Sequence, residues 1–135
     1  MKIISITVVV IFTIFFWLAE CGSKNNVKQI NAENFTISYG MSTYKAQDKM
    51  EQEIVDALVK DYNNIKLDGT TNEEINYDKA ITIIFINNDQ ISGQVTVDDK
   101  RICRIEGNKD SYTISEESNI YPNALKVYQD LKTKP

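Results

Sequence analysis

The stretch KAITIIFINNDQISGQVTVDDKRICRIEGNKDSYTIS, residues 79–115, decides the fold of this chain. It contains four apolar runs rich in the residues that strands prefer, at Lys79–Ile86, Ile91–Val97, Arg101–Glu106 and Ser111–Ser115. Short polar clusters, typical of turns, separate these runs. Because connections this short join antiparallel neighbours, the stretch predicts a four-stranded antiparallel meander.

The loop between the second and third runs sets which side chains share the core face. A two-residue turn would place Cys103 and Ile105 among polar side chains. A three-residue loop at Asp98–Lys100 instead places Cys103 beside Val95, so we expect the longer loop. The core face of the meander then carries Ile91, Gly93, Val95, Val97, Cys103, Ile105, Tyr112 and Ile114.

The first run has more apolar side chains than one face can carry. If Ile84 and Ile86 lie on the core face, three large side chains must point the other way, namely Ile81, Ile83 and Phe85. Either the connector 64–78 or the N-terminal segment folds over these three, or they form an interaction patch for a partner protein or an apolar ligand. Both alternatives are open at the level of sequence.

A strand and a helix are predicted before the meander. Phe35, Ile37 and Tyr39 alternate with polar side chains, which predicts a half-buried strand that ends at Gly40. Apolar residues at helical spacing then predict a helix over about 43–63, with Ser42 or Thr43 as its N-cap. The strand and the helix are expected to pack with the meander around one core.

A connector at 64–78 follows this helix, with a turn signal at Leu67-Asp68-Gly69. A second helix is predicted at about Pro122–Lys132, because proline suits a first helical turn and three apolar side chains share one face, namely Leu125, Tyr128 and Leu131. The predicted fold is therefore α+β, in the order β-α-β-β-β-β-α, with an antiparallel sheet and two helices packed on one face.

The N-terminal residues have the pattern of an export signal. Lys2 is followed by an uncharged, mostly apolar run, Ile3–Ala19. With Leu18-Ala19-Glu20-Cys21 at its end, the run resembles the signal peptide and lipobox of a bacterial lipoprotein. The resemblance implies that Cys21 is lipidated and becomes the first mature residue. Lipoboxes normally carry a small residue at the position of Glu20, so an uncleaved N-terminal membrane anchor is the alternative.

These assignments divide the chain into three parts. Residues 1–20 are the predicted signal peptide or membrane anchor, 21–29 a flexible polar tether, and 30–135 a single α+β domain. Both alternatives for the anchor predict attachment to the cell membrane, with the domain facing outside the cytoplasm.

Composition argues against several classes of function. The formal net charge is −4, whereas a nucleic-acid-binding protein requires a basic surface. The chain contains no histidine, the commonest general base and metal ligand. Cys103 has apolar neighbours and is interpreted as a buried, inert thiol, and the pair Asp98-Asp99 as a solvated turn. We therefore predict no catalytic residue, no metal and no cofactor.

The domain resembles small membrane-anchored domains of unknown function from low-GC Gram-positive bacteria, of the YhfM-like type. The similarity lies in the helix around Glu53–Leu58, the Asn76-Tyr77-Asp78 entry into the first meander strand, the strand Ser111–Ser115 and the closing helix. This resemblance implies an extracytoplasmic domain and transfers no catalytic residue.

Three functions are compatible with these observations. The predicted one is a non-enzymatic module that captures an envelope protein through the patch of Ile81, Ile83 and Phe85. The alternative is a small-ligand-binding lipoprotein, whose pocket between sheet and helices would be lined by tyrosines. A hydrolase using carboxylates is the third. For the ligand-binding alternative, seven tyrosines are available to line the pocket: Tyr39, Tyr44, Tyr62, Tyr77, Tyr112, Tyr121 and Tyr128.

Overall fold

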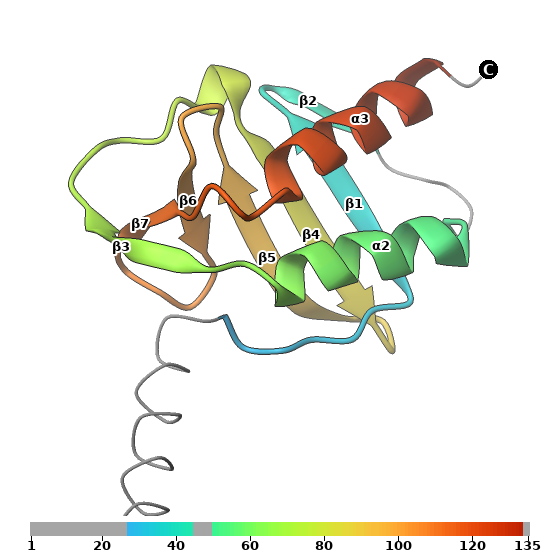
Figure 1. Cartoon of the computed structure of the whole chain (residues 1–135). Coiled ribbons are helices and arrows are strands. Elements are labelled where there is room, and N and C mark those ends of the chain that lie inside the picture. The colour runs from blue at the N-terminus through green and yellow to red at the C-terminus, as the bar shows by residue number, and fades with distance from the viewer. Residues whose placement is uncertain (1–26, 45–49, 134–135) are drawn as a thin grey trace, which may run out of the picture.

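The computed structural model describes residues 27–44 and 50–133 of the chain. In this part, seven strands form one antiparallel sheet in the order β2-β1-β4-β5-β6-β7-β3, and helices α2 and α3 lie across one of its faces (Figure 1). The elements are β1 (Asn34–Tyr39), β2 (Ser42–Tyr44), α2 (Gln52–Asn63), β3 (Leu67–Thr71), β4 (Ile81–Asn87), β5 (Gln90–Val97), β6 (Ile102–Ile105), β7 (Ser111–Ile114) and α3 (Ile120–Thr133). The predicted α+β class, with two helices on one face, is confirmed.

Two edge strands replace parts of the predicted helix and connector. Ser42–Tyr44 pairs with β1, so α2 begins only at Gln52 and its N-cap position is Glu51. Leu67–Thr71, which contains the predicted turn, pairs with β7 as the opposite edge. These strands form because a neighbouring strand supplies backbone partners, and that pairing overrides the local sequence signal.

The hairpin between β5 and β6 confirms that Val95, Val97, Cys103 and Ile105 are buried together, and it corrects their predicted pairing. Val97 pairs with Cys103, and Val95 pairs with Ile105 rather than with Cys103. The loop has three residues, but they are 99–101, one position later than predicted. The Asp98 N–H donates to the Ile102 carbonyl at 3.0 Å, and Arg101 adopts a φ of 67°, as three-residue hairpin loops require.

The predicted interaction patch is wrong, because its three side chains are core residues. Ile81, Ile83 and Phe85 have 0% exposure and pack with α2 and α3. The half-exposed Ile84 and Ile86 lie on the other face. Side chains of both predicted covers belong to the same buried cluster, namely Val27 and Ile30 from the N-terminal segment and Ile65 from the connector, together with residues of α2 and α3.

A β-bulge explains why the two faces of β4 are exchanged relative to the prediction. Phe85 pairs with Gly93, whereas Ile86 pairs with Ile91, so Ser92 is an extra residue with no partner on β4. One extra residue reverses the alternation of side chains beyond it. As a result, Ile91 leaves the core face and is 61% exposed.

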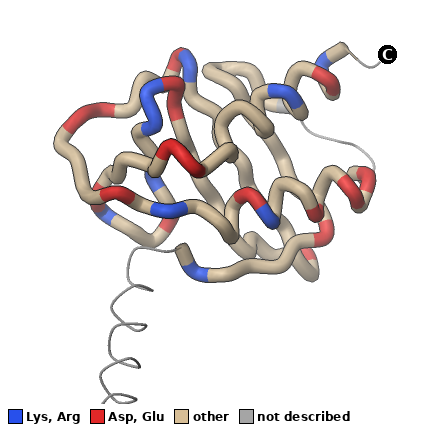
Figure 2. The backbone as a smooth tube through the Cα atoms, viewed as in Figure 1, with Lys and Arg blue, Asp and Glu red and all other residues tan. Residues whose placement is uncertain are grey.

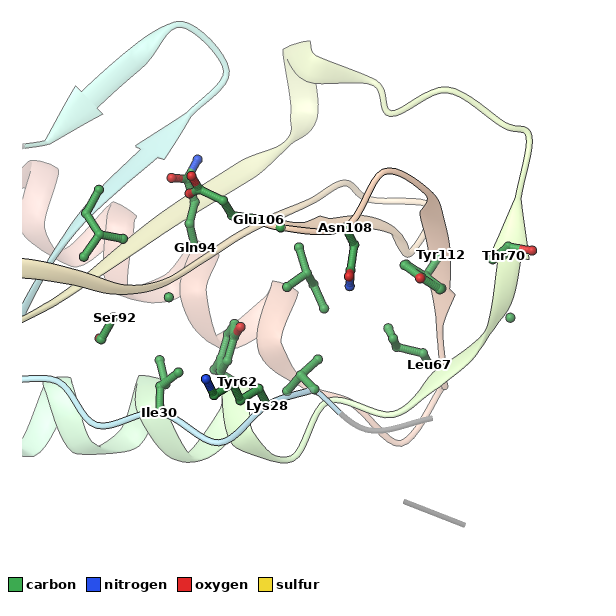
Figure 3. A pocket seen from close by; sticks show the side chains of 16 residues that line it. Lys28, Ile30, Tyr62, Leu67, Thr70, Ser92, Gln94, Glu106, Asn108 and Tyr112 are labelled. Atoms are coloured by element: carbon green, nitrogen blue, oxygen red, sulfur yellow. The ribbon is translucent and has the colours of Figure 1, made fainter. Parts of the chain in front are cut away.

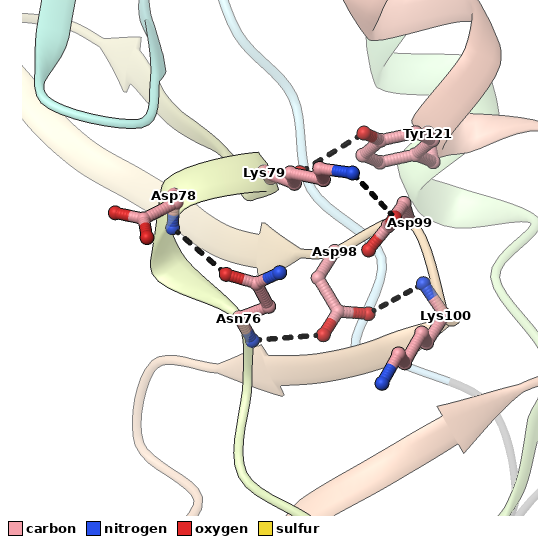
Figure 4. A network of polar contacts seen from close by, with 7 residues as sticks. All are labelled: Asn76, Asp78, Lys79, Asp98, Asp99, Lys100 and Tyr121. Carbon is pink, nitrogen blue, oxygen red and sulfur yellow. Dashed lines mark hydrogen bonds and ion pairs between the residues drawn. The ribbon is translucent and has the colours of Figure 1, made fainter.

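The Asp98 side chain links the β5–β6 hairpin by a hydrogen bond to Asn76, in the connector between β3 and β4 (Figure 4). Its side chain is completely buried, which corrects the interpretation of Asp98-Asp99 as a solvated turn. One carboxylate oxygen accepts from the N–H groups of Lys100 and Ile102, both at 2.9 Å, and the other accepts from the Asn76 N–H at 3.0 Å. These bonds offset the cost of burying the carboxylate and set where the loop begins.

Candidate ligand-binding cavity

A cavity of about 800 Å³ lies on the helix-covered side of the sheet, beside strands β5, β6, β7 and β3. The chain just before β1 forms its opposite wall, and the last turn of α2 contributes Tyr62 (Figure 3). Its volume falls within the range of about 300–1,000 Å³ that is typical of small-molecule sites. We take this cavity as the candidate site because its lining includes a buried hydroxyl group, that of Ser92, which has no hydrogen-bond partner among the described residues.

The lining combines an apolar interior with uncharged polar groups. In Figure 3, Tyr62, Leu67, Asn108 and Tyr112 extend into the space between the upper strands and the lower wall. Aliphatic side chains supply much of the remaining surface: Val27, Ile30, Leu67, Ile91 and Ile105. Hydroxyl and amide groups set among aliphatic and aromatic side chains suit an uncharged ligand with both polar and apolar parts.

Tyr62 brings a hydroxyl group to the cavity from the last turn of α2. Its residue is 3% exposed, and its ring packs edge-on against Phe85 with centroids 5.4 Å apart. Its hydroxyl makes no hydrogen bond to another described residue. Burial, and then the nearby Cys103, raise the pKa of Tyr62, which keeps its hydroxyl protonated as a donor. The ring is buried while the hydroxyl oxygen is accessible from the cavity, so this oxygen is available to a ligand.

Ser92 lies on the cavity wall at the β-bulge. Its Oγ is buried and has no hydrogen-bond partner among the described residues. Bulges commonly redirect a side chain beside a functional site, and an unsatisfied buried hydroxyl requires an explanation. The bulge thus brings a second unpaired hydroxyl to the same region as Tyr62.

The opposite wall is formed by residues 27–32, here termed the strap. Asn63, the last residue of α2, holds it through both ends of its side-chain amide. The Ile30 N–H donates to Asn63 Oδ1 at 2.8 Å, and Asn63 Nδ2 donates to the Ile30 carbonyl at 3.0 Å. Gln29 Nε2 adds a bond to the Asn63 carbonyl at 2.9 Å. Val27 is also buried. Residues 27–29 were predicted to belong to a flexible tether. In the structure they are instead held against the domain, by the burial of Val27 and the bond from Gln29.

Gly93 permits the strap to approach the sheet closely. A Cβ atom at this position would lie 3.0 Å from Ile30 Cδ1 and 3.5 Å from Tyr62 Cζ. The first distance is too short for an ordinary carbon–carbon contact, so only glycine lets Ile30 settle here without displacement. The absence of one side chain on β5 thus determines how closely the strap covers the cavity.

The ionic residues of the lining balance one another. Lys28 and Glu106 both have exposed side chains, and in Figure 3 Glu106 points away from the cavity. Acidic and basic residues are interspersed over the rest of the described surface (Figure 2). A fully charged ligand would thus gain no buried counter-charge inside the cavity and would lose its hydration.

Cys103 does not line the cavity and is completely buried. Burial, and then the Asp98 carboxylate, raise the pKa of the thiol to about 12. The predicted burial of Cys103 is thus confirmed. Because its pKa is raised, little of the thiolate required for nucleophilic chemistry is present at neutral pH, which argues for an inert thiol. Within residues 27–44 and 50–133, no three acidic or cysteine side chains gather as metal ligands would.

The remaining predicted site residue, Cys21, lies outside the described residues, as do positions 1–20 of the predicted signal peptide. No helix in the described part is long and apolar enough to cross a membrane. Of the seven tyrosines considered for a pocket, Tyr62 and Tyr112 line the cavity. No local pattern marks Ser92 or Asn63, because Ser92 is placed by an irregular pairing of β4 with β5 and Asn63 by its bonds to the distant Ile30.

A second hollow, of about 570 Å³, lies between α2 and α3. Its walls include Ile54, Leu58, Val127 and Leu131, and its polar groups lie mainly at the helix surfaces. Among the described residues that line this groove, no buried hydroxyl lacks a hydrogen-bond partner, in contrast to Ser92 in the first cavity.

Comparison of the chain with protein-family models, with curated proteins and with solved structures finds no match.

Proposed function

We propose that this protein binds an uncharged small molecule at the outer face of the cell membrane, and that the cavity beside the strap is its binding site. The observation that carries the proposal is the unpaired hydroxyl of the buried Tyr62, which extends into a cavity of about 800 Å³. The burial of Ile81, Ile83 and Phe85 removes the surface on which a protein-interaction role depended.

The chemistry of the lining suggests a ligand with an apolar body and a head that bears hydroxyl or amide groups. Aliphatic side chains would cover the apolar body, while Tyr62, Tyr112 and Asn108 would bond to the head. The proposed role is binding without catalysis, because the chain has no histidine to act as a general base and its buried thiol is held protonated.

Attachment to the membrane is the second part of the proposal, and it is supported by the lipobox-like sequence that ends at Cys21. Two acyl chains on this residue would give stable anchoring. The intact mass of protein extracted from membranes tests the modification. A mature chain that begins at a diacylated Cys21 is expected, and a full-length, unmodified mass would show that the anchor is the uncleaved apolar segment instead.

Short alkyl glucosides provide a direct test of the cavity. The full chain, in phosphatidylcholine nanodiscs and labelled at isoleucine methyl groups, would be titrated with hexyl β-glucoside. We expect shifts at Ile30 and Ile105, which line the cavity, and none at Ile54 in the interhelical groove. Methyl β-glucoside should bind at least about tenfold more weakly, because each buried CH₂ contributes about 0.8 kcal/mol. Hexyl sulfate should also bind more weakly, because its charge would be buried unpaired.

Tyr62→Phe is the matched test of the hydroxyl. It should weaken hexyl β-glucoside binding about threefold to tenfold, the effect of losing one hydrogen bond. Tyr128→Phe is the control, because Tyr128 is similarly buried but lies outside the cavity lining. Equal affinities of the two variants would contradict the proposed role of Tyr62. The absence of shifts at the cavity methyl groups with millimolar hexyl β-glucoside would overturn the choice of ligand class.

A further inference from the structure

The strap is joined to β1 at one end, and at the other it is held by hydrogen bonds to Asn63 and by two buried apolar side chains. At its C-terminal end, the Glu33 N–H donates to the Ile86 carbonyl at 2.8 Å, where β1 begins to pair with β4. Towards the N-terminus, the contacts of the strap are the bonds to Asn63 and the burial of Val27 and Ile30. A segment attached in this way can leave the domain without disturbing the sheet pairing.

Asn63 satisfies both backbone groups of Ile30 at once. Its side-chain amide accepts from the Ile30 N–H and donates to the Ile30 carbonyl, as a paired strand would. The two residues are 33 positions apart in the sequence. Asn63 is not part of the cavity lining, whereas Val27, Lys28 and Ile30 of the strap are. Among the residues that line the cavity, Ile30 is the one to which the Asn63 side chain is hydrogen-bonded in the described structure, so Asn63 contacts the cavity wall through the strap.

We propose that Asn63 is a positioning residue that holds the strap as the movable wall of the ligand cavity, so that ligand binding and strap docking are linked. This inference rests on the proposed function for its ligand. A ligand that contacts Val27 and Ile30 stabilises the docked strap, and a released strap weakens ligand binding by the same factor. Because residues 21–26 of the predicted tether precede the strap in the sequence, occupancy of the cavity would determine how much chain separates the domain from its anchor.

Hydrogen–deuterium exchange of the full chain in phosphatidylcholine nanodiscs tests the positioning role without any ligand. The Ile30 amide should be protected in the wild type. Asn63→Ala should accelerate its exchange about tenfold or more, because two hydrogen bonds are lost. Exchange in β4 should be unchanged. Asn123→Ala is the control, since Asn123 donates to Asp61 at 2.9 Å on the other side of α2 and lies outside the cavity.

The outcomes separate this inference from the proposed function. Unchanged exchange at Ile30 in Asn63→Ala, or equal acceleration throughout the domain, would overturn the positioning role. Hexyl β-glucoside should slow exchange of the strap in the wild type and bind more weakly to Asn63→Ala. If hexyl β-glucoside shifts the cavity methyl groups but leaves strap exchange and the affinity of Asn63→Ala unaltered, the linkage is refuted while the binding site stands. If hexyl β-glucoside does not bind but the strap is released in Asn63→Ala, the positioning role is supported and the proposed ligand class fails.

Discussion

Replacement of Asp98 by alanine tests whether one buried carboxylate determines the β5–β6 hairpin. The substitution removes the acceptor for three backbone N–H groups, those of Asn76, Lys100 and Ile102. Hydrogen bonds to a charged group each contribute about 1.5–3 kcal/mol. Only the bond to Ile102 is fully buried, so water can replace part of the other two. We therefore expect a loss of about 3–5 kcal/mol in the free energy of unfolding.

Two neighbouring substitutions calibrate this value. Asp98→Asn retains an oxygen for Lys100 and Ile102 but turns an amide donor towards the Asn76 N–H, and should cost about 1–2 kcal/mol. Asp99→Ala removes only a partly exposed ion pair with Lys79, whose closest atoms are 4.0 Å apart, and should cost less than about 1 kcal/mol.

Urea denaturation of the full chain, followed by circular dichroism, measures all three free energies. The reasoning predicts the order Asp98→Ala, Asp98→Asn, Asp99→Ala, from the largest loss to the smallest. A loss below about 1 kcal/mol for Asp98→Ala, or equal losses for the two alanine variants, would refute it. Because the hairpin places Ile105 on the cavity wall, Asp98→Ala should also weaken binding of hexyl β-glucoside.

Three further predictions concern buried residues. The folded-state pKa of Cys103, about 12, exceeds the unfolded value of about 8.5, so the unfolded state loses its proton first. Stability should therefore fall by up to about 1.4 kcal/mol per pH unit between about pH 9 and pH 12, and urea titrations at several pH values should show a shallower fall in Cys103→Ala. Phe85→Ala should lower the free energy of unfolding by about 3–5 kcal/mol in the same assay, because Phe85 is fully buried. A loss below about 1 kcal/mol would contradict this burial and favour a position on the surface. Ser92→Ala should leave stability unchanged or raise it slightly, because its hydroxyl has no partner in the described structure; a loss above about 1 kcal/mol would reveal one.

Part of the cavity could be anticipated from the sequence. The alternation in the meander predicted that Val95, Cys103 and Ile105 share the core face, and the structure confirms this. The number of tyrosines suggested a tyrosine-lined pocket, and Tyr62 and Tyr112 line the cavity. The strap was missed because residues 22–29 are mostly polar, as in a tether, and because the hydrogen bonds of Gln29 and Ile30 to Asn63 leave no local pattern.

The sequence by itself determined the α+β class, the antiparallel meander and the final helix, because the periodicity of side chains along a strand or helix is a local property. Only the tertiary structure decided which face of β4 is buried, since the extra residue at Ser92 reverses the alternation and nothing within β4 records it. It also decided that Asp98 is buried and that the strap docks, because each depends on a partner distant in the sequence: Asn76 for Asp98, and Asn63 for Ile30.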